Sequence, residues 1–410
     1  MPTLLGLGFA LLTLYLLPFF GFMALVTVAA VSRRRGASEP PVSGPPPRFV
    51  FAIPAHNEEG NISATVASCR GVVYDPAFFR VFVIADNCTD ATAQTARAAG
   101  AEVVERIEPE RRSKGYGLEY FFARMAEQGQ GGRYGFDAAV VIDADTLVDP
   151  GLLSRFAEVL AGGADWAQCY YTVSNPDASW RTRLLTYAFS LFNGIWLLGQ
   201  DRLGLSVGLR GNGMCFSARG LKRMPWRAYG LVEDQEFSWM LRIAGEHARF
   251  LPETRVYAEM VSKSDAAVSQ RRRWEEGRRS LRGKFLRPLL ATRMLPPIDK
   301  TLSLIDLFMP PLMPLFILLA AALVVHPLAL GLPALAVWTR VLLPVHVFFV
   351  LAALAYALSP FFTLGLPARY LMSLTAVPYY AVWKLLATFR ARTTAWVRTE
   401  RESPAGSGRA

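Results

Sequence analysis

The sequence predicts an α/β domain built on a mostly parallel sheet and flanked by transmembrane helices. Apolar residues concentrate near both ends of the 410-residue chain, whereas the stretch between them mixes charge, glycine and short apolar runs. In that middle stretch, β-rich runs alternate with helical segments, as in parallel sheets covered by helices. Polar residues follow several predicted strands, at the sheet edge where such folds bind ligands.

The N-terminal segment, 1–35, predicts a transmembrane helix with a basic stop. Residues 3–32 carry no charge and exceed the roughly 20 apolar residues that a helix needs to span a bilayer. Arg33, Arg34 and Arg35 follow, and basic residues beside a span mark its cytosolic side. The proline-rich stretch 36–48 predicts an extended linker to a domain over 49–284.

Overall composition favours a membrane protein with one cytosolic domain. The chain is 52% hydrophobic and 19% charged, and its net charge of +11 clusters beside apolar segments. That clustering favours membrane topology and contact with membrane lipids, and argues against nucleic acid as a partner. The 4 cysteines are far apart and lack metal-ligand spacing, which favours a reduced domain.

The first half of the domain predicts four strands and three helices in alternation. The apolar runs at 49–55, 81–86, 101–106 and 138–143 have the composition of buried strands. The segments 60–70, 90–99 and 114–128 fit helices. The order predicts a parallel sheet with helices on both faces, and the carboxyl ends of its strands should meet at one edge.

Three of these strands end in polar residues that are candidates for a binding site. The first ends in His56, Asn57 and Glu58, the second in Asp86, and the fourth in Asp143 and Asp145. Aspartate and asparagine often end strands because they favour turns, but three such ends together favour a site. Two carboxylates at i, i+2 on a strand share one face, where they suit a hard divalent cation bound to a diphosphate.

Lys114 precedes the predicted helix at 114–128, where both the ammonium group and the helix N-terminus would attract a phosphate. An exposed basic loop is the alternative interpretation. The spacing of a P-loop is absent around Lys114, and no Gly-x-Gly-x-x-Gly follows the first strand. These absences disfavour a nucleoside triphosphatase and a dinucleotide oxidoreductase.

Three later motifs complete the set of candidate residues. Arg210-Gly-Asn212-Gly213 enters a predicted strand, and Glu233, Asp234 and Glu236 begin a helical repeat. The acidic run also suits a helix N-terminus without any catalytic role. Gln270-Arg-Arg-Arg273-Trp274 lies in a basic segment that also fits a helix at the membrane surface.

The C-terminal region, 285–389, predicts two spans near 302–325 and 341–358, followed by an interfacial helix over 361–388. Prolines within the first of these spans imply kinks. A basic tail at 390–410 places the C-terminus in the cytosol, which requires an even number of crossings after the domain. The prediction is an integral protein of the plasma (inner) membrane with a cytosolic catalytic domain.

The ordered motifs resemble the family 2 glycosyltransferases, and most of all their membrane branch of cellulose, hyaluronan and poly-N-acetylglucosamine synthases. The resemblance covers about 49–284 and rests on five motifs in sequence order: Pro54-Ala-His-Asn-Glu58, Asp86, Asp143-Ala-Asp145, Glu233-Asp234, and Gln270-x-x-Arg273-Trp274. It implies a GT-A fold, an inverting reaction, a UDP-sugar donor, and Mg²⁺ or Mn²⁺ as cofactor. Ceramide glucosyltransferase has a similar arrangement with a lipid acceptor.

The same resemblance implies a role for each matching residue. Pro54, His56, Glu58 and Asp86 would hold the nucleoside, Asp143 and Lys114 the nucleotide, and Asp145 the metal. Asp234 would be the general base. Asn212, Gly213 and Glu233 would line the acceptor pocket, Gln270 and Arg273 would cap the diphosphate, and Trp274 would stack on the acceptor sugar.

Two departures from the family pattern leave these carboxylates in place. Val232 stands where the family commonly has threonine, and Asn87 stands where glycine is common after Asp86. The acceptor is either a polysaccharide or a lipid that receives a single sugar. A transport or non-catalytic subunit of a polysaccharide export system is a further alternative, for which Asp306 and Arg340 are the supporting residues.

Overall fold

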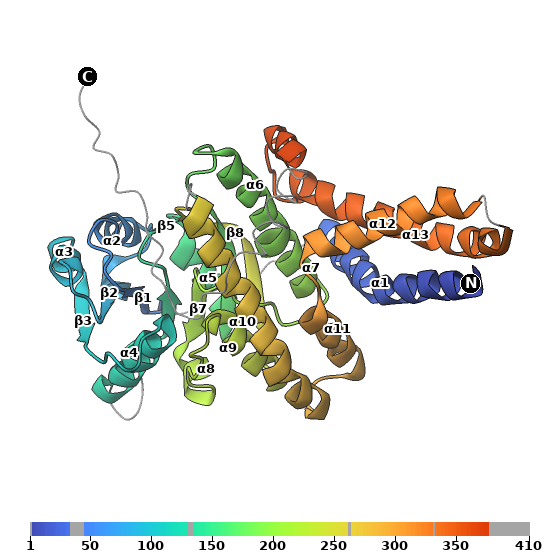
Figure 1. Cartoon of the computed structure of the whole chain (residues 1–410). Helices are drawn as coiled ribbons and strands as arrows, with labels where there is room; N and C mark the ends of the chain where they lie inside the picture. The colour runs from blue at the N-terminus through green and yellow to red at the C-terminus, as the bar shows by residue number, and fades with distance from the viewer. Residues whose placement is uncertain (1, 33–44, 130–133, 261–263, 331–332, 377–410) are drawn as a thin grey trace, which may run out of the picture.

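A mixed, eight-stranded sheet forms the centre of the domain in the computed structural model (Figure 1). The structure describes residues 2–32, 45–129, 134–260, 264–330 and 333–376; the side chains of 2–5, 264–274, 328–330 and 333–335 lie outside that description. Its strand order is β3-β2-β1-β4-β7-β6-β8-β5. One half of this sheet is parallel and the other half is mixed.

The parallel half consists of the four predicted strands, β1 (Phe49–Ala55), β2 (Phe79–Asp86), β3 (Glu102–Arg106) and β4 (Ala138–Val141). β1 pairs in parallel with β2 and with β4, and β2 with β3. All but one residue of β1 are buried, because neighbouring strands and helices enclose it on every side. The predicted α/β class is confirmed, and each of the four strands begins and ends within two residues of its prediction.

The mixed half consists of β5 (Thr146–Val148), β6 (Trp166–Val173), β7 (Met214–Ser217) and β8 (Ala248–Ala258). β7 lies antiparallel to both β4 and β6, β8 runs parallel to β6, and β5 lies antiparallel to β8. The residues between β4 and β7 therefore leave the sheet, return through β6 and the helices after it, and deliver the Arg210–Gly213 segment to the edge beside β4.

Helices cover both faces of the sheet. On one face, α2 (Ile62–Arg70), α3 (Thr92–Ala98) and α5 (Leu152–Ala161) pack on alternate residues of the parallel strands. On the other, α4 (Lys114–Gln128) and α9 (Glu233–Ile243) pack on the intervening residues. Short connecting elements complete the domain: η1 (Pro76–Phe78), α6 (Trp180–Phe189), the π-helix η3 (Ser190–Ile195), α7 (Trp196–Arg202) and α8 (Ala218–Arg223).

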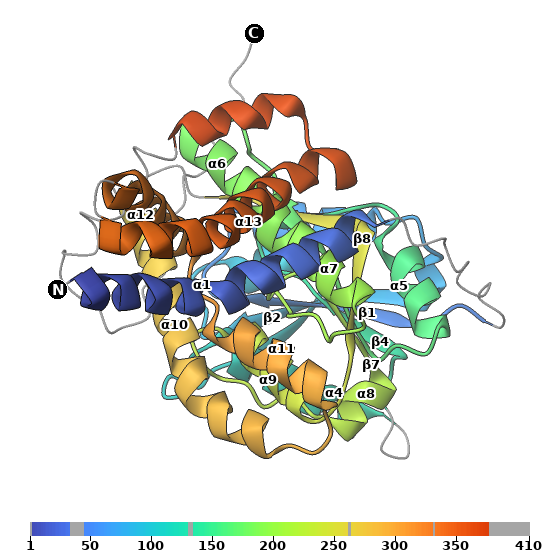
Figure 2. The same cartoon turned by 90° about the vertical axis from the view of Figure 1, so that its right-hand side faces the viewer.

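The second face of the sheet shares one continuous hydrophobic core with the apolar helices at the two ends of the chain. These are α1 (Pro2–Val31), α12 (Leu312–Leu330) and α13 (Pro333–Thr363), which lie side by side and extend away from the sheet (Figure 1). Among the described residues, the ranges Gly6–Val31 and Ala336–Thr363 are long and apolar enough to span a membrane. In Figure 1, α7 and α11 (Pro297–Phe308) lie between this bundle and the sheet, and Figure 2 looks onto the bundle, with α1 and α13 crossing in front of the domain.

The segment predicted as a span at 302–325 is broken. It forms α11 (Pro297–Phe308) and α12, which meet at an angle of 89°. Prolines at 310 and 311 lie at the break, where they prevent the helix from continuing. This pair counts as a third candidate span only if the bent helices cross together.

Two predicted boundaries in the C-terminal region meet continuous helices. The limit at 284 falls inside α10 (Ser264–Ala291), and the start of the predicted interfacial helix at 361 falls inside α13. After α13 the chain forms the 3₁₀ segment η4 (Ala368–Ala376). The rest of that predicted helix and the basic tail lie outside the described residues, as does most of the 36–48 linker, so the predicted domain limits and topology stay predictions.

Candidate active site

Three predicted residues from three separate segments, Lys114, Asp143 and Glu233, meet at the carboxyl edge of the parallel strands. The Nζ of Lys114, at the start of α4, lies 2.5 Å from Oδ1 of Asp143, which follows β4. The same Nζ lies 3.9 Å from Oε1 of Glu233, at the start of α9. It also donates a hydrogen bond to the carbonyl oxygen of Gly211. Lys114 therefore joins the Asp143 loop, the glycine-rich segment and the acidic start of α9.

Local sequence accounts for the position of Lys114. Ser113 caps α4, because its Oγ accepts a hydrogen bond from the backbone N–H of Tyr116 at 3.4 Å. Lys114 is then the first helical residue, so its ammonium group extends from the end of the helix toward the strand ends. Lys114 does not lie in an exposed basic loop, the alternative interpretation of its sequence, because carboxylates surround its ammonium group.

Burial and neighbouring charges shift the pKa values of this cluster. Burial opposes the charged form of Lys114, but the carboxylates of Asp143, Glu233 and Asp234 together outweigh it and raise its pKa. Burial raises the pKa of Glu233 to about 7, with Lys114 opposing the shift and Asp234 adding to it. Burial also raises the pKa of Asp234, although Lys114 and Arg210 oppose that shift. The cluster keeps its cation charged and makes Glu233 and Asp234 stronger proton acceptors than ordinary carboxylates.

Asn212 and Gly213, predicted to line an acceptor pocket, lie beneath this cluster. The fully buried Asn212 accepts a hydrogen bond from the backbone N–H of Asp143 at 3.2 Å through its Oδ1. Its Nδ2 donates to Oγ1 of Thr146 at 2.7 Å. Gly213 has a φ of +70°, and a Cβ at this position would lie 2.3 Å from Sγ of Cys169. These contacts hold the loop that carries Asp143 and Asp145. They therefore favour a positioning role for Asn212 and Gly213.

A second group of predicted residues lies at the ends of β1 and β2. Nη1 of Arg106 forms an ion pair with Oδ1 of Asp86 at 2.6 Å, and the arginine side chain is only 2% exposed. Burial raises the pKa of Asp86 even though Arg106 opposes the shift. Nδ1 of His56 lies 2.8 Å from the carbonyl oxygen of Asp86. Arg106 and His56 therefore fix Asp86 at the end of its strand.

Pro54 and Glu58 border this second group. Pro54 is the sixth residue of β1 and half-buried. Glu58 accepts a hydrogen bond from Nδ2 of Asn61 at 3.0 Å, and its backbone N–H donates to Oγ1 of Thr92 at 2.7 Å. Asn57 between them has a φ of +57°, a left-handed conformation that asparagine adopts more readily than most residues. The loop after β1 thus turns back over the start of α3.

The first turn of α4 lies between the two groups. Lys114 belongs to the first group, whereas a Cβ on Gly117 would lie 3.8 Å from Cβ of Asp86 in the second. The two groups therefore flank one helix N-terminus, a place where backbone N–H groups attract anions. Asp145, the predicted metal ligand, is half-buried just after the same strand as Asp143, and its Oδ1 accepts a hydrogen bond from Oγ1 of Thr146 at 3.2 Å.

Gln270, Arg273 and Trp274 belong to α10, but their side chains lie outside the described part of the structure. Their predicted roles at the diphosphate and the acceptor stay predictions.

Sequence reasoning assigned no role to three residues that support the site. Arg106 pairs with Asp86. Gln168 is fully buried and binds the glycine-rich segment at both ends: its Oε1 accepts from the backbone N–H of Arg210 at 2.8 Å, and its Nε2 donates to the carbonyl oxygen of Asn212 at 2.8 Å. Arg210 itself is half-buried, and its charge interacts favourably with that of Asp234. A charged or amide residue inside an apolar strand, such as Gln168 in β6, was the available signal.

The structure combines an α/β fold with a cluster, at one sheet edge, of a lysine and half-buried carboxylates beside a helix N-terminus. The family described as Glycosyltransferase like family 2 matches residues 46–277, which is more than half of the chain. The chain belongs to this family, so it is a glycosyltransferase.

Individual proteins show the same likeness. The chain is 24% identical over 349 residues to an N-acetylglucosaminyltransferase of Sinorhizobium fredii, covering 82% of this chain and 81% of that protein. It is 34% identical over 125 residues to a low-salt glycan biosynthesis hexosyltransferase of Haloferax volcanii, covering 30% and 27%. A solved structure of a mannosyltransferase from Pyrobaculum calidifontis superposes with a TM-score of 0.55 at 17% identity, covering 87% of this chain and 99% of that one. That superposition agrees with the GT-A fold.

Proposed function

We propose that this protein is an inverting glycosyltransferase that moves a sugar from a UDP-sugar to a polysaccharide or glycolipid acceptor at the cytosolic face of the membrane. The observation that carries the proposal is the position of Lys114, between Asp143 on the side of the strand ends and the Glu233–Asp234 pair on α9. A cation suited to a diphosphate and a half-buried carboxylate suited to act as a base would then lie within one site. The name of the Sinorhizobium relative favours N-acetylglucosamine as the sugar, whereas the Pyrobaculum structure holds GDP-mannose.

The donor would lie along the carboxyl edge of the parallel strands. Asp86, fixed by Arg106, would bind the nucleoside together with Pro54, His56 and Glu58. Asp143 would contact the nucleotide, and Lys114 would neutralise negative charge that develops on the leaving diphosphate, because its raised pKa keeps it charged. Gln270 and Arg273 would cap the diphosphate from α10.

Asp145 would hold the divalent cation, Mg²⁺ or Mn²⁺. Among the described residues, no group of three or more His, Cys, Asp or Glu side chains could hold a metal ion by itself. A single carboxylate fits this chemistry, because Mg²⁺ often binds one or two carboxylates and takes its other ligands from substrate phosphates and water. Bound there, the cation would offset the charge of the leaving diphosphate. The Pyrobaculum structure contains Mn²⁺.

Asp234 would remove the proton from the acceptor hydroxyl as that oxygen attacks the anomeric carbon. Its raised pKa makes the carboxylate a better base than an exposed aspartate. Glu233, with a pKa of about 7, would hold the acceptor beside it, and Trp274 would stack on the acceptor sugar. Displacement from the face opposite the diphosphate inverts the anomeric carbon.

The test is transfer activity of the full chain in membranes with a panel of UDP- and GDP-sugars, with metal added or chelated. We expect one nucleotide sugar to be consumed only with the divalent cation. Asp234→Asn should lower the rate by about 10²- to 10⁴-fold, the usual contribution of a general base. Glu253→Gln, which changes an exposed carboxylate on β8, is the matched control and should keep the wild-type rate.

Full activity of Asp234→Asn would contradict the assigned base. Product size separates the two acceptor classes, since a ladder indicates a polymer and a single organic-soluble product indicates addition to a lipid. Solute movement without consumption of nucleotide sugar would instead support a transport subunit.

A further inference from the structure

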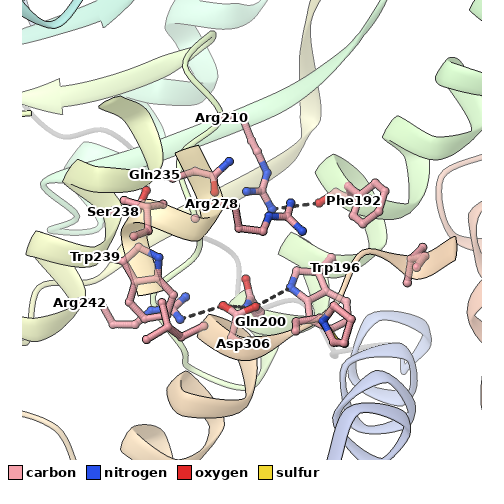
Figure 3. A pocket seen from close by; sticks show the side chains of 16 residues that line it. Phe192, Trp196, Gln200, Arg210, Gln235, Ser238, Trp239, Arg242, Arg278 and Asp306 are labelled. Atoms are coloured by element: carbon pink, nitrogen blue, oxygen red, sulfur yellow. Dashed lines mark hydrogen bonds and ion pairs between the residues drawn. The ribbon is translucent and has the colours of Figure 1, made fainter. Parts of the chain in front are cut away.

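A cavity of about 90 Å³ lies between the catalytic domain and the membrane helices (Figure 3). Residues of η3, α7 and α9 line one side of it, and residues at the break between α11 and α12 line the other. This volume is enough for a small polar group.

The cavity is next to the proposed base. Gln235, which lines it, follows Asp234 in the first turn of α9. One turn later, Ser238 also lines it and donates a hydrogen bond to the carbonyl oxygen of Asp234 at 2.7 Å. A group bound in the cavity would therefore lie beside the acceptor side of the site.

Three arginines and one carboxylate line the cavity, which leaves an excess of positive charge. Asp306 is already neutralised, because its Oδ2 lies 2.9 Å from Nη1 of Arg242. Asp306 also accepts hydrogen bonds from Nε2 of Gln200 at 3.0 Å and from Nε1 of Trp196 at 3.3 Å. The remaining cations are Arg210 and Arg278, whose side chains lie close together in Figure 3.

Neither Arg210 nor Arg278 forms an ion pair with a carboxylate in the described part of the chain. Nη2 of Arg210 donates to the carbonyl oxygen of Phe192 in the π-helix at 3.3 Å, while its buried Nε has no hydrogen-bond partner. Burial lowers the pKa of both side chains. The two half-buried guanidinium groups repel each other, although Asp234 and Asp306 favour the charge of Arg210, and arginine forks match the oxygens of phosphate.

Several other lining residues have apolar side chains, which the hydrocarbon part of an amphiphile would contact. Trp196 and Trp239 present large aromatic surfaces, and Leu307, Met309 and Leu312 come from the apolar helices on either side of the 89° break. The two unpaired cations thus come from the domain and from α10, and the break between α11 and α12 supplies apolar side chains. This polarity fits a phosphate attached to a hydrocarbon chain.

We propose that this cavity binds the phosphate group of a lipid acceptor through Arg210 and Arg278, and so presents that lipid to the base Asp234. The inference rests on the proposed function and narrows its acceptor to a phosphate-bearing amphiphile. Binding here involves no bond formation, only the pairing of the phosphate with the two guanidinium groups.

The probes are dodecyl phosphate and dodecanol, which differ only in the phosphate, added to the purified full chain in a neutral detergent. Binding is followed by tryptophan fluorescence, because two tryptophans line the cavity. We expect dodecyl phosphate to bind at least about tenfold more tightly than dodecanol, since a hydrogen bond to a charged group commonly contributes that much. Equal affinities in the wild type would overturn the proposal.

Arg278→Gln and Arg210→Gln should each lower that preference by about tenfold. Arg279→Gln is the matched control, because Arg279 is the next residue of α10 and is exposed, and it should leave the preference unchanged. If Arg278→Gln lowers the thermal midpoint, Arg278→Lys keeps the charge and should retain most of the preference. An unchanged preference in both glutamine variants, or an equal loss in Arg279→Gln, contradicts the assignment.

Inorganic phosphate distinguishes a lipid phosphate from a free anion. We expect it to compete with dodecyl phosphate only weakly, because it lacks the chain that contacts the apolar side. Competition at equal concentration would assign the cavity to free phosphate and overturn the lipid part of the proposal.

Nucleotide-sugar binding by the same preparation separates this inference from the proposed function. If the wild type binds the donor but does not prefer dodecyl phosphate, only the cavity assignment is wrong. Failure to bind or consume any nucleotide sugar defeats the proposed function, whatever the amphiphile result.

Discussion

Glu233 and Asp234 show how position changes the chemistry of ordinary carboxylates. An acidic residue at the start of a helix is favourable by itself, and that alone would explain both residues. In the structure, however, α9 begins beneath Lys114, and burial raises the pKa of both side chains. On an exposed helix, the same two carboxyl groups would already lose their protons at pH values well below 7.

The raised pKa of Glu233 predicts a change of stability with pH. A carboxyl group whose pKa is about 7 in the folded chain, above its unfolded value of 4.5, gives stability that is complete below the unfolded pKa. That stability is lost as pH rises through 7, because the folded chain must give up a proton that it binds more tightly. We therefore expect Glu233→Gln to gain thermal stability relative to wild type as pH rises from 5 to 8.

The check is the thermal midpoint of both proteins across this pH range. Glu253→Gln, at an exposed position, should follow the wild type throughout. A constant difference between Glu233→Gln and wild type at every pH would refute the assigned pKa.

Individual residues were predictable where a polar side chain ended an apolar strand. Asp86 and Asp143 were predicted in this way, whereas Lys114 was predicted because it begins a helical segment; the structure brings all three to one sheet edge. Arg210 and Arg278 were not, because neither the glycine-rich sequence around Arg210 nor the basic sequence around Arg278 shows that the side chain will be half-buried without an ion pair. That property depends on α10 and α11 packing against α9, which no local pattern encodes.

The first turn of α4 shows how an element can depend on one missing side chain. A Cβ on Gly115 would lie 2.1 Å from the carbonyl oxygen of Ala228, in the loop that leads into α9. Nε1 of Trp226 also donates to the carbonyl oxygen of Gly115 at 3.1 Å, which holds this loop against the helix. The position of Glu233 therefore depends on the absence of a side chain at Gly115.

We expect Gly115→Ala to destabilise the protein by about 1–3 kcal/mol, the usual cost of overpacking a close contact. Gly117→Ala is the control in the same helical turn, because its Cβ would make only ordinary contacts, with Cγ2 of Ile84 at 3.6 Å the nearest. It should be neutral or slightly stabilising, since alanine favours helices. Thermal unfolding of the two variants measures the difference, and equal midpoints would show that the Ala228 contact does not limit stability.

At the scale of elements, the parallel half of the sheet was predictable because each strand and helix is a local pattern with a recognisable period. The mixed half was less so, since the antiparallel pairing of β7 with β4 joins residues more than seventy positions apart. The break between α11 and α12 was expected only as a kink, because proline predicts an interruption but not its angle.

The whole molecule is held together by contacts between the catalytic domain and the first membrane helix. A Cβ on Gly199 of α7 would lie 2.2 Å from the carbonyl oxygen of Val26. The backbones of α1 and α7 are therefore in close contact at this point. Nη1 of Arg202 donates to the carbonyl oxygens of Ala30 and Ser32, the latter at 2.7 Å. The domain thus supplies hydrogen bonds to the carbonyl groups that the end of α1 leaves without helical partners.

Gly199→Ala should loosen this junction and lower the thermal midpoint by about 2 °C, because overpacking costs about 2 kcal/mol and the unfolding entropy of a chain of 410 residues is large. Gly21→Ala in α1 is the control, because a Cβ there would meet no atom within 4 Å. Its midpoint should match the wild type. A similar fall in both variants would indicate a general effect of alanine and not the junction.

Arg202 and Gly199 attach α1 directly to the catalytic domain. Because those contacts do not depend on the peptide link through 33–44, the helix and the rest of the protein behave as two complementary fragments. Synthesised separately in one membrane, they should associate without a covalent connection, and a protease that cuts the linker should leave them together.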